Sequence, residues 1–229
     1  MVDLNLDPRE VYRGQVDSVF RLLPAILLVD FFAASGLVAF VVVTTTNYTP
    51  LIYAWMGGVI LITASRAIVT KYYQLASTIE DNLDIRSHVL LGSIIASGII
   101  WGTTWVIMPF GSLEPPRGAI TLWPCIMLAG AVANLAVLKR LYVALAGTTI
   151  ALQIAYLLSQ GNSQDLQLIF GFSAYTLFFL MIANRIGKDL TRGIVLKLQN
   201  ERLSENLRQD RLTLKQNEIE LFNQIEREK

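Results

Sequence analysis

Residues 165–229 read DLQLIFGFSAYTLFFLMIANRIGKDLTRGIVLKLQNERLSENLRQDRLTLKQNEIELFNQIEREK, and the composition changes midway without a helix breaker. The part up to residue 186 is mostly apolar and long enough to cross a hydrocarbon core about 30 Å thick as a helix. The part 188–229 is rich in charged helix formers, has no proline and has one glycine, Gly193. The stretch therefore predicts one helix that leaves a membrane and continues as a rod in water.

Five further apolar stretches precede this segment, and each is of membrane-spanning length. The six candidate spans are 20–44, 51–70, 88–110, 118–138, 141–159 and 165–186. Short polar connections separate them, such as TTTNYTP at 44–50 and SLEPPR at 112–117. We therefore predict an all-α membrane protein with an N-terminal arm (1–19), a bundle of six transmembrane helices (20–187) and a cytoplasmic rod (188–229).

The composition narrows the classes of function. Only 16% of the residues are charged, against about a quarter in soluble domains. A net charge of +1 argues against nucleic-acid binding, which usually needs a clustered basic surface. The single cysteine, Cys125, and the single histidine, His88, leave no cysteine metal cluster and no bis-histidine haem site. We expect no metal, no cofactor and no catalytic residue in this chain.

The distribution of Lys and Arg among the connections predicts the orientation. Eight of these residues lie in the arm, around the connection after the second span and in the connection after the fourth, whereas Arg117 alone lies on the opposite side. Since connections rich in Lys and Arg stay on the cytoplasmic side, both termini are expected in the cytoplasm. Arg66 lies close enough to the inner end of its span to snorkel towards the interface.

The N-terminal arm carries a helix signal of its own. Asp7, Pro8 and Glu10 are typical of the first turn of a helix. The apolar residues that follow fall largely on one face: Val11, Val16, Val19, Phe20 and Leu23. Two interpretations stay open, a short amphipathic helix on the inner membrane surface or an early start of the first span.

Leucines recur along the rod with the spacing of a coiled coil. Leu207, Leu214 and Leu221 repeat every seven residues, and Leu196 and Leu203 do so in the neighbouring seam position. This repeat favours a parallel coiled coil, and hence a homodimer, over a lone helix. The remaining seam positions are polar: Asp210, Asn217 and Gln224. The seam therefore forms either a marginal coil held together by the membrane domains or a coil with two nearly equal registers that a twist can switch.

The junction between the last span and the rod is expected to transmit a conformational change. Gly187 and Gly193 lower helix stability at this point, and the leucine seam would carry the change onward. The rod runs to Lys229 without a terminating glycine. We therefore expect an output domain that follows the rod and is absent from this chain.

Polar residues inside the spans are the candidates for a functional site: Asp30, Arg66, Asn134 and Asn184. An ionisable residue at the centre of a span costs about 2.5–3.5 kcal/mol on insertion scales, so each requires an account. We expect Asp30 to contact Arg66, directly or through water, and the four to form one cluster. The cluster is either hydrogen-bonded glue between helices or a pocket that relays a signal.

The third span, GSIIASGIIWGTTWVIMP at 92–109, combines small residues with tryptophans. Gly92, Gly98 and Gly102 give surfaces for close helix approach. Trp101 lies deeper than the other tryptophan of this stretch and is the candidate for the wall of a pocket.

Several short sequence features along the chain occur in the order in which they are found in one known group of membrane domains. They are Gln15-Val16 with Phe20-Arg21 and Pro24, Arg66 with Tyr73, Gly98 to Gly102 with Trp105 and Pro109, and Gly130-Ala131. In these the chain resembles the six-helix membrane input domain found upstream of bacterial histidine kinases and GGDEF-type diguanylate cyclases. The resemblance implies a homodimeric receptor in the bacterial inner membrane whose partners are the bilayer and a small lipophilic ligand. Asp30 departs from the pattern, where an asparagine is usual nearby, and no ligand-binding residue is carried over.

The expected function is that of a sensory module that controls a cytoplasmic histidine kinase or nucleotide cyclase through a dimeric coiled coil. The alternative is a small transporter or channel, but the first three spans show no convincing repeat in the last three. An intramembrane enzyme is disfavoured, because the spans lack a His-rich, Asp-pair or Ser/Lys motif.

Overall fold

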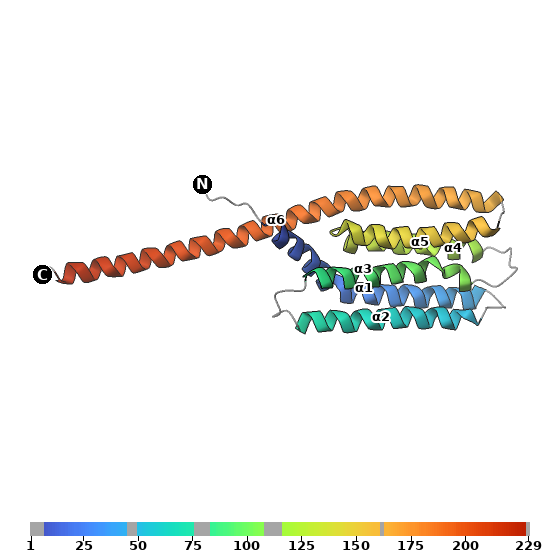
Figure 1. Cartoon of the computed structure of the whole chain (residues 1–229), viewed down its shortest axis with the longest axis horizontal. Coiled ribbons are helices and arrows are strands. Elements are labelled where there is room, and N and C mark those ends of the chain that lie inside the picture. The colour runs from blue at the N-terminus through green and yellow to red at the C-terminus, as the bar shows by residue number, and fades with distance from the viewer. Residues whose placement is uncertain (1–6, 45–49, 76–82, 108–115, 161–162, 228–229) are drawn as a thin grey trace.

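The computed structural model describes residues 7–44, 50–75, 83–107, 116–160 and 163–227, and every regular element in these ranges is a helix (Figure 1). The elements in chain order are α1 (Pro8–Thr44), α2 (Leu51–Leu75), α3 (Leu83–Gly102), the short 3-10 helix η1 (Thr104–Ile107), α4 (Pro116–Leu135), α5 (Lys139–Gln160) and α6 (Ser163–Arg227). The helices lie roughly along one axis, and α6 projects far beyond the others.

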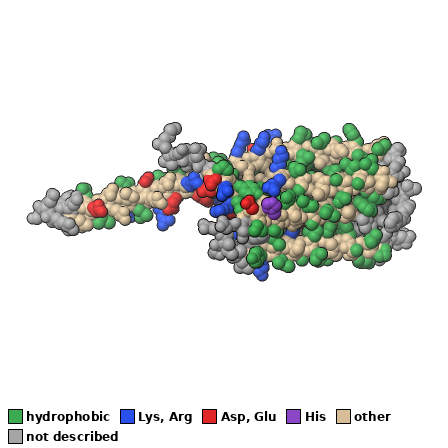
Figure 2. Space-filling model, in the orientation of Figure 1, with side chains coloured by type: hydrophobic (Ala, Val, Ile, Leu, Met, Phe, Trp, Pro, Cys, Tyr) green, Lys and Arg blue, Asp and Glu red, His purple; other side chains and the backbone are tan. Residues whose placement is uncertain are grey.

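The helices have the length and surface of membrane-spanning segments. Five of them, α1, α2, α3, α5 and α6, are long and apolar enough to cross a membrane, and the part of α4 searched, Trp123–Leu135, is a shorter apolar helix. Large apolar side chains cover their outer faces, among them Phe32, Leu61, Ile68, Phe170 and Met181 (Figure 2). An exposed apolar surface of this extent is compatible with a multi-pass membrane protein.

Small residues lie at the contact between α3 and α5, the most extensive helix pair in the described part of the chain. A Cβ atom added to Gly98 would collide with Thr148, and one added to Gly102 would lie 2.9 Å from the Thr149 carbonyl oxygen. These two glycines are four residues apart and let the backbones approach, as in other membrane helix pairs. The expectation of close approach is confirmed for them but not for Gly92, whose added Cβ would meet nothing within 4 Å.

The arm is the first part of α1 and packs into the protein. Val16 and Val19 are fully buried, and Phe20 and Leu23 join the same core with residues of α3, α4 and α5. The face assigned to the membrane surface therefore faces other helices, which is a correction to that interpretation. Pro24 lies inside α1. A proline removes a backbone hydrogen bond and bends a helix, and Figure 1 shows α1 bent between its first turns and its longer remainder.

Two helix boundaries in the structure differ from those predicted from the sequence. The third span was expected to run to residue 110, but α3 ends at Gly102 and continues as η1, and residues 108–110 lie outside the described ranges. The turn expected at Lys139-Arg140 is formed by Ala136–Leu138 instead, since Lys139 already begins α5.

The last span and the rod form one unbroken helix, as the sequence predicts. The 65 residues of α6 include both Gly187 and Gly193 without a break. The seam residues Leu196, Leu203, Leu207, Leu214 and Leu221 all leave at least 46% of their surface exposed. Pairing of this stripe with a second copy stays a prediction.

Candidate functional site

Arg66 is the most unusual side chain of the protein, because a guanidinium group is almost completely buried. Only 2% of the residue is exposed. Its Nη1 donates to Asp30 Oδ2 at 3.2 Å, and its Nη2 donates to the Ser93 carbonyl oxygen at 2.6 Å. The expected direct contact with Asp30 is present, whereas the expected snorkelling is wrong: α2 runs nine residues past Arg66, and the side chain turns inward to α1 and α3.

Arg66 and Asp30 line a cavity of about 250 Å³ between the helices. Four of the five candidate residues meet there, since Trp101 and Asn134 also line it. The rest of the wall is mostly apolar, and includes Ile26, Val29, Ile94, Met127 and Leu145. A small cavity with few polar groups in an apolar wall has the composition of a site for a small amphipathic molecule.

Asn184 does not belong to this cavity, which corrects the prediction of one four-residue cluster. It lines a second pocket, at the junction of α6 with the α4–α5 turn, together with Gln15, Gly187 and Thr191. Asn134 and Asn184 were grouped because both fall near the ends of apolar stretches. Hydropathy does not report how far a helix is rotated about its axis, so it could not separate them.

Trp101 forms part of the cavity wall, as expected, and is held by a second tryptophan. It is 4% exposed, and its ring lies edge-to-face against Trp55 with centroids 5.6 Å apart. The Trp55 Nε1 donates to the Ile100 carbonyl oxygen at 2.9 Å, which ties α2 to α3. This edge-to-face pair fixes the plane of the Trp101 ring.

Two polar residues of α5 were missed by the sequence reasoning. Thr149 lines the cavity and donates from Oγ1 to the Gly98 carbonyl oxygen at 3.2 Å. Gln153 is buried one turn later and donates from Nε2 to Thr104 Oγ1 at 2.8 Å, while its Oε1 is buried without a partner among the described residues. Their spacing of four residues on one face of an apolar helix was the signal that could have identified them.

The predicted transmission residues lie outside the cavity, on α6. Gly187 lies directly against the α4–α5 turn, since an added Cβ would collide with the Ala136 carbonyl oxygen. Gly193 has open space around it. One turn after Gly187, Thr191 accepts a hydrogen bond of 2.9 Å from Gln15 Nε2 of α1.

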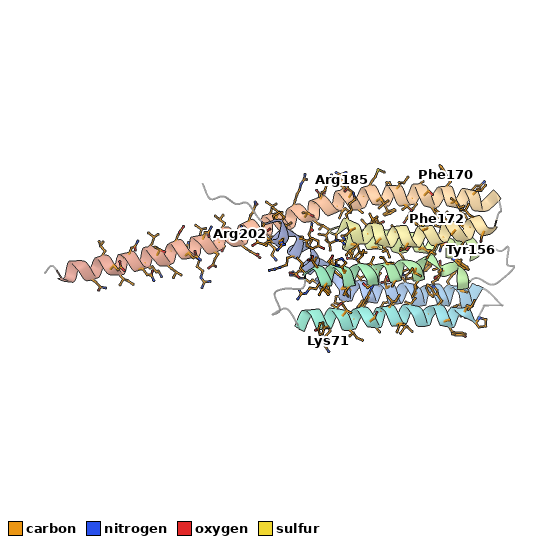
Figure 3. All side chains as sticks on the ribbon, viewed as in Figure 1. Lys71, Tyr156, Phe170, Phe172, Arg185 and Arg202 are labelled. Carbon is orange, nitrogen blue, oxygen red and sulfur yellow. The ribbon has the colours of Figure 1, made fainter. Side chains whose placement is uncertain are left out.

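The arm of α1 holds α6 at three levels of the helix. Besides the Gln15–Thr191 hydrogen bond, Gly14 packs under Ile194, whose Cγ2 would lie 2.8 Å from an added Cβ. Further along the rod, Arg202 forms an ion pair with Glu10, at the point where the arm reaches the rod (Figure 3). The arm of α1 and the α4–α5 turn are therefore both in direct contact with α6.

The polar side chains of the cavity offer hydrogen-bonding groups beside an aromatic ring. Among the described residues, no group of three or more His, Cys, Asp or Glu side chains could hold a metal ion. Asp30, Arg66 and Asn134 offer hydrogen-bond donors and acceptors beside the Trp101 ring. Comparison with known proteins finds no family model, no curated protein and no solved structure that matches this chain.

Proposed function

We propose that the chain is a membrane-embedded sensory module that passes a conformational signal to a cytoplasmic output domain beyond the rod. The output domain is a histidine kinase or a nucleotide cyclase, in keeping with the resemblance to six-helix input domains. The module sits in the bacterial inner membrane as a bundle of six transmembrane helices with both termini in the cytoplasm. A small lipophilic or amphipathic ligand binds in the cavity lined by Asp30, Arg66, Trp101 and Asn134.

The observation that carries the proposal is the single helix α6. It packs against α4 and α5 in the membrane part and continues without a break into the rod. A rigid helix that begins beside a cavity-bearing bundle and ends far outside it can convert a small change in packing into a rotation or shift of the rod.

The position of the arm supports pairing of the rods. With Leu207 at position a of the heptad, the residues of α6 that the arm contacts, Thr191, Ile194 and Arg202, fall at positions f, b and c. These positions face away from the seam. The arm therefore holds the back of α6 and leaves the leucine stripe free for a second copy.

A reporter fusion tests the sensory role. The rod is extended in heptad phase beyond Lys229 into the catalytic core of a diguanylate cyclase, and cyclic di-GMP is measured in cells. Asp30→Asn and Trp101→Ala, which alter the cavity, are expected to change the output at equal protein levels. Phe32→Ala, on the exposed face of the same helix as Asp30, is the control and leaves the output unchanged. Identical output from all variants and the parent fusion would refute the proposal.

The buried Asp30–Arg66 pair also favours a second candidate, a small transporter or channel. Ionisable pairs inside membrane helices frequently mark ion or proton pathways. Liposomes that contain the purified chain and a pH-sensitive dye distinguish the two functions. A proton or ion flux that Asp30→Asn abolishes would assign transport, and the sensory module predicts no flux.

A further inference from the structure

The second pocket, where the rod meets the helix bundle, is lined by several positively charged side chains. It has a volume of about 550 Å³ and is lined by residues of α1, the α4–α5 turn, the start of α5, and α6. Its charged lining residues are all basic: Lys139, Arg140, Lys188 and Arg192. Figure 2 shows that charged side chains of both signs, Lys and Arg as well as Asp and Glu, gather where the rod meets the bundle.

Most of this charge has no ion-pair partner among the residues that the structure describes. Arg192 forms an exposed ion pair with Asp189 at 3.5 Å. For Lys139, Arg140 and Lys188, the part of the chain that the structure describes supplies no carboxylate within ion-pair distance. Within the described ranges, three cations of the lining therefore have no ion-pair partner, and they come from two elements, the start of α5 and the middle of α6.

Uncharged donors complete the lining. Asn184 and Gln15 each offer an amide beside the cations. The pocket also contains the N-terminus of α5, which begins at Lys139 and is preceded by Leu138, a residue without a side-chain acceptor to cap it. The partial positive charge of a helix N-terminus attracts anions and adds to that of the basic side chains, although the Leu141 amide of this first turn already donates to the Leu138 carbonyl oxygen at 2.8 Å.

We propose that this junction pocket binds a phosphate group, carried either by an anionic lipid headgroup or by a free phosphorylated compound. Arg140 and Lys188 are its main charged contacts, from α5 and α6 respectively, and Asn184 donates a hydrogen bond. Basic pockets between membrane helices on the cytoplasmic side are recognised sites for lipid phosphates. The bound phosphate ties α5 to α6 beside Gly187, where α6 leaves the bundle. The site is separate from the cavity and does not depend on the sensory role.

Binding is measured on the purified full chain in an uncharged detergent, by native mass spectrometry with titrated phosphatidylglycerol or inorganic pyrophosphate. The pocket variant is Arg140→Gln/Lys188→Gln. The matched control, Lys71→Gln/Arg208→Gln, removes one lysine and one arginine elsewhere: Lys71 lies at the end of α2, on the side of the bundle away from α6 (Figure 3), and Arg208 on the rod. All four side chains are on exposed residues, so the variants are expected to fold.

The pocket variant is expected to weaken binding at least about tenfold, because two charge-assisted hydrogen bonds are lost. Asn184→Ala weakens it about threefold, the effect of one ordinary hydrogen bond. The affinity of the control variant is expected to stay within about twofold of that of the parent chain, since exposed charges far from a site are screened. Binding of phosphatidylglycerol alone assigns a lipid headgroup, and binding of pyrophosphate assigns a free phosphorylated compound. Failure of both probes to bind, or equal losses in the pocket variant and the control, would overturn the proposal.

Discussion

Arg66 connects three helices of the bundle. A guanidinium group stays charged at any physiological pH, and burying it without partners would cost several kcal/mol. The Asp30 carboxylate of α1 and the Ser93 carbonyl oxygen of α3 are partners for the two Nη groups, whereas the Nε is buried without a partner among the described residues. The three residues therefore fix α1, α2 and α3 relative to one another and form the polar corner of the cavity.

Removing only the acid should be more harmful than removing both charges. Asp30→Ala leaves the buried Arg66 with one partner fewer, and the free energy of unfolding is expected to fall by about 3 kcal/mol. The double variant Asp30→Ala/Arg66→Met removes the unpaired charge and should recover at least half of that loss. Thermal unfolding in one detergent, compared across the set, measures both effects. An Asp30→Ala variant as stable as the parent would show that the ion pair is not structural.

Some residues of the site could be predicted from the sequence, and others could not. The cost of an ionisable group in a span identified Asp30 and Arg66, and the depth of Trp101 identified a pocket wall. The role of the Ser93 carbonyl, the support of Trp101 by Trp55 and the separation of Asn184 from Asn134 were not predictable. Each depends on how the helices are rotated about their axes and which neighbours they meet, and an apolar span carries little information on either.

At the scale of the helices, glycines distinguish close contacts from open faces. Gly98 of α3 lies against Thr148 of α5, while Gly92, on the same helix, has no neighbour within 4 Å. Both are helical glycines, so alanine would raise the intrinsic helix propensity at either position by a similar amount. The difference between the two substitutions therefore measures the helix contact alone.

Gly98→Ala is expected to destabilise the protein by about 1–3 kcal/mol, since the added methyl group must separate α3 from α5. Gly92→Ala should leave it unchanged or raise its stability by up to about 1 kcal/mol. Thermal unfolding of the two variants in the same detergent provides the comparison. Equal effects at the two positions would mean that the close α3–α5 contact is absent in solution.

Gly187 and Gly193 of α6, where this helix leaves the bundle, allow a second comparison of a packed glycine with an open one. Gly187→Ala brings a methyl group against the Ala136 carbonyl oxygen and should displace α6 from the α4–α5 turn, again at a cost of about 1–3 kcal/mol. Gly193→Ala has open space and should strengthen the helix by about 0.5–1 kcal/mol. Unfolding midpoints of the two variants test this. If Gly187→Ala is as well tolerated as Gly193→Ala, the turn does not hold α6.

The elements themselves were largely predictable, and their ends were not. Length and hydropathy gave the positions of the six apolar helices, and the absence of proline and the scarcity of glycine gave the continuity of α6. The early end of α3 at Gly102 and the packing of the arm against α6 depend on contacts with helices distant in sequence. Val16 and Val19 illustrate this, because an apolar face suits a membrane surface and a protein core equally well.

At the scale of the whole molecule, a polar cavity lies in a bundle from which one helix, α6, continues as a long rod. The cavity lies among α1 to α5, and α6 is held by the arm of α1 and by the α4–α5 turn. Under the proposed sensory function, a rearrangement around Asp30 and Arg66 is expected to reach α6 through α1 and α4, which both contact it. The exposed leucine stripe is the part of the rod where such a movement becomes measurable, because two copies would pair there.

Cysteine crosslinking along the rod tests this coupling most directly. Leu207→Cys and Leu214→Cys are made separately in a Cys125→Ser background, with Gln209→Cys, outside the seam, as the control, and dimers are quantified after oxidation in native membranes. The account predicts crosslinks at Leu207 and Leu214 but not at Gln209, and a changed ratio of the two when Asp30→Asn is added. The absence of crosslinks at both leucine positions, or a ratio that Asp30→Asn leaves unaltered, would contradict it.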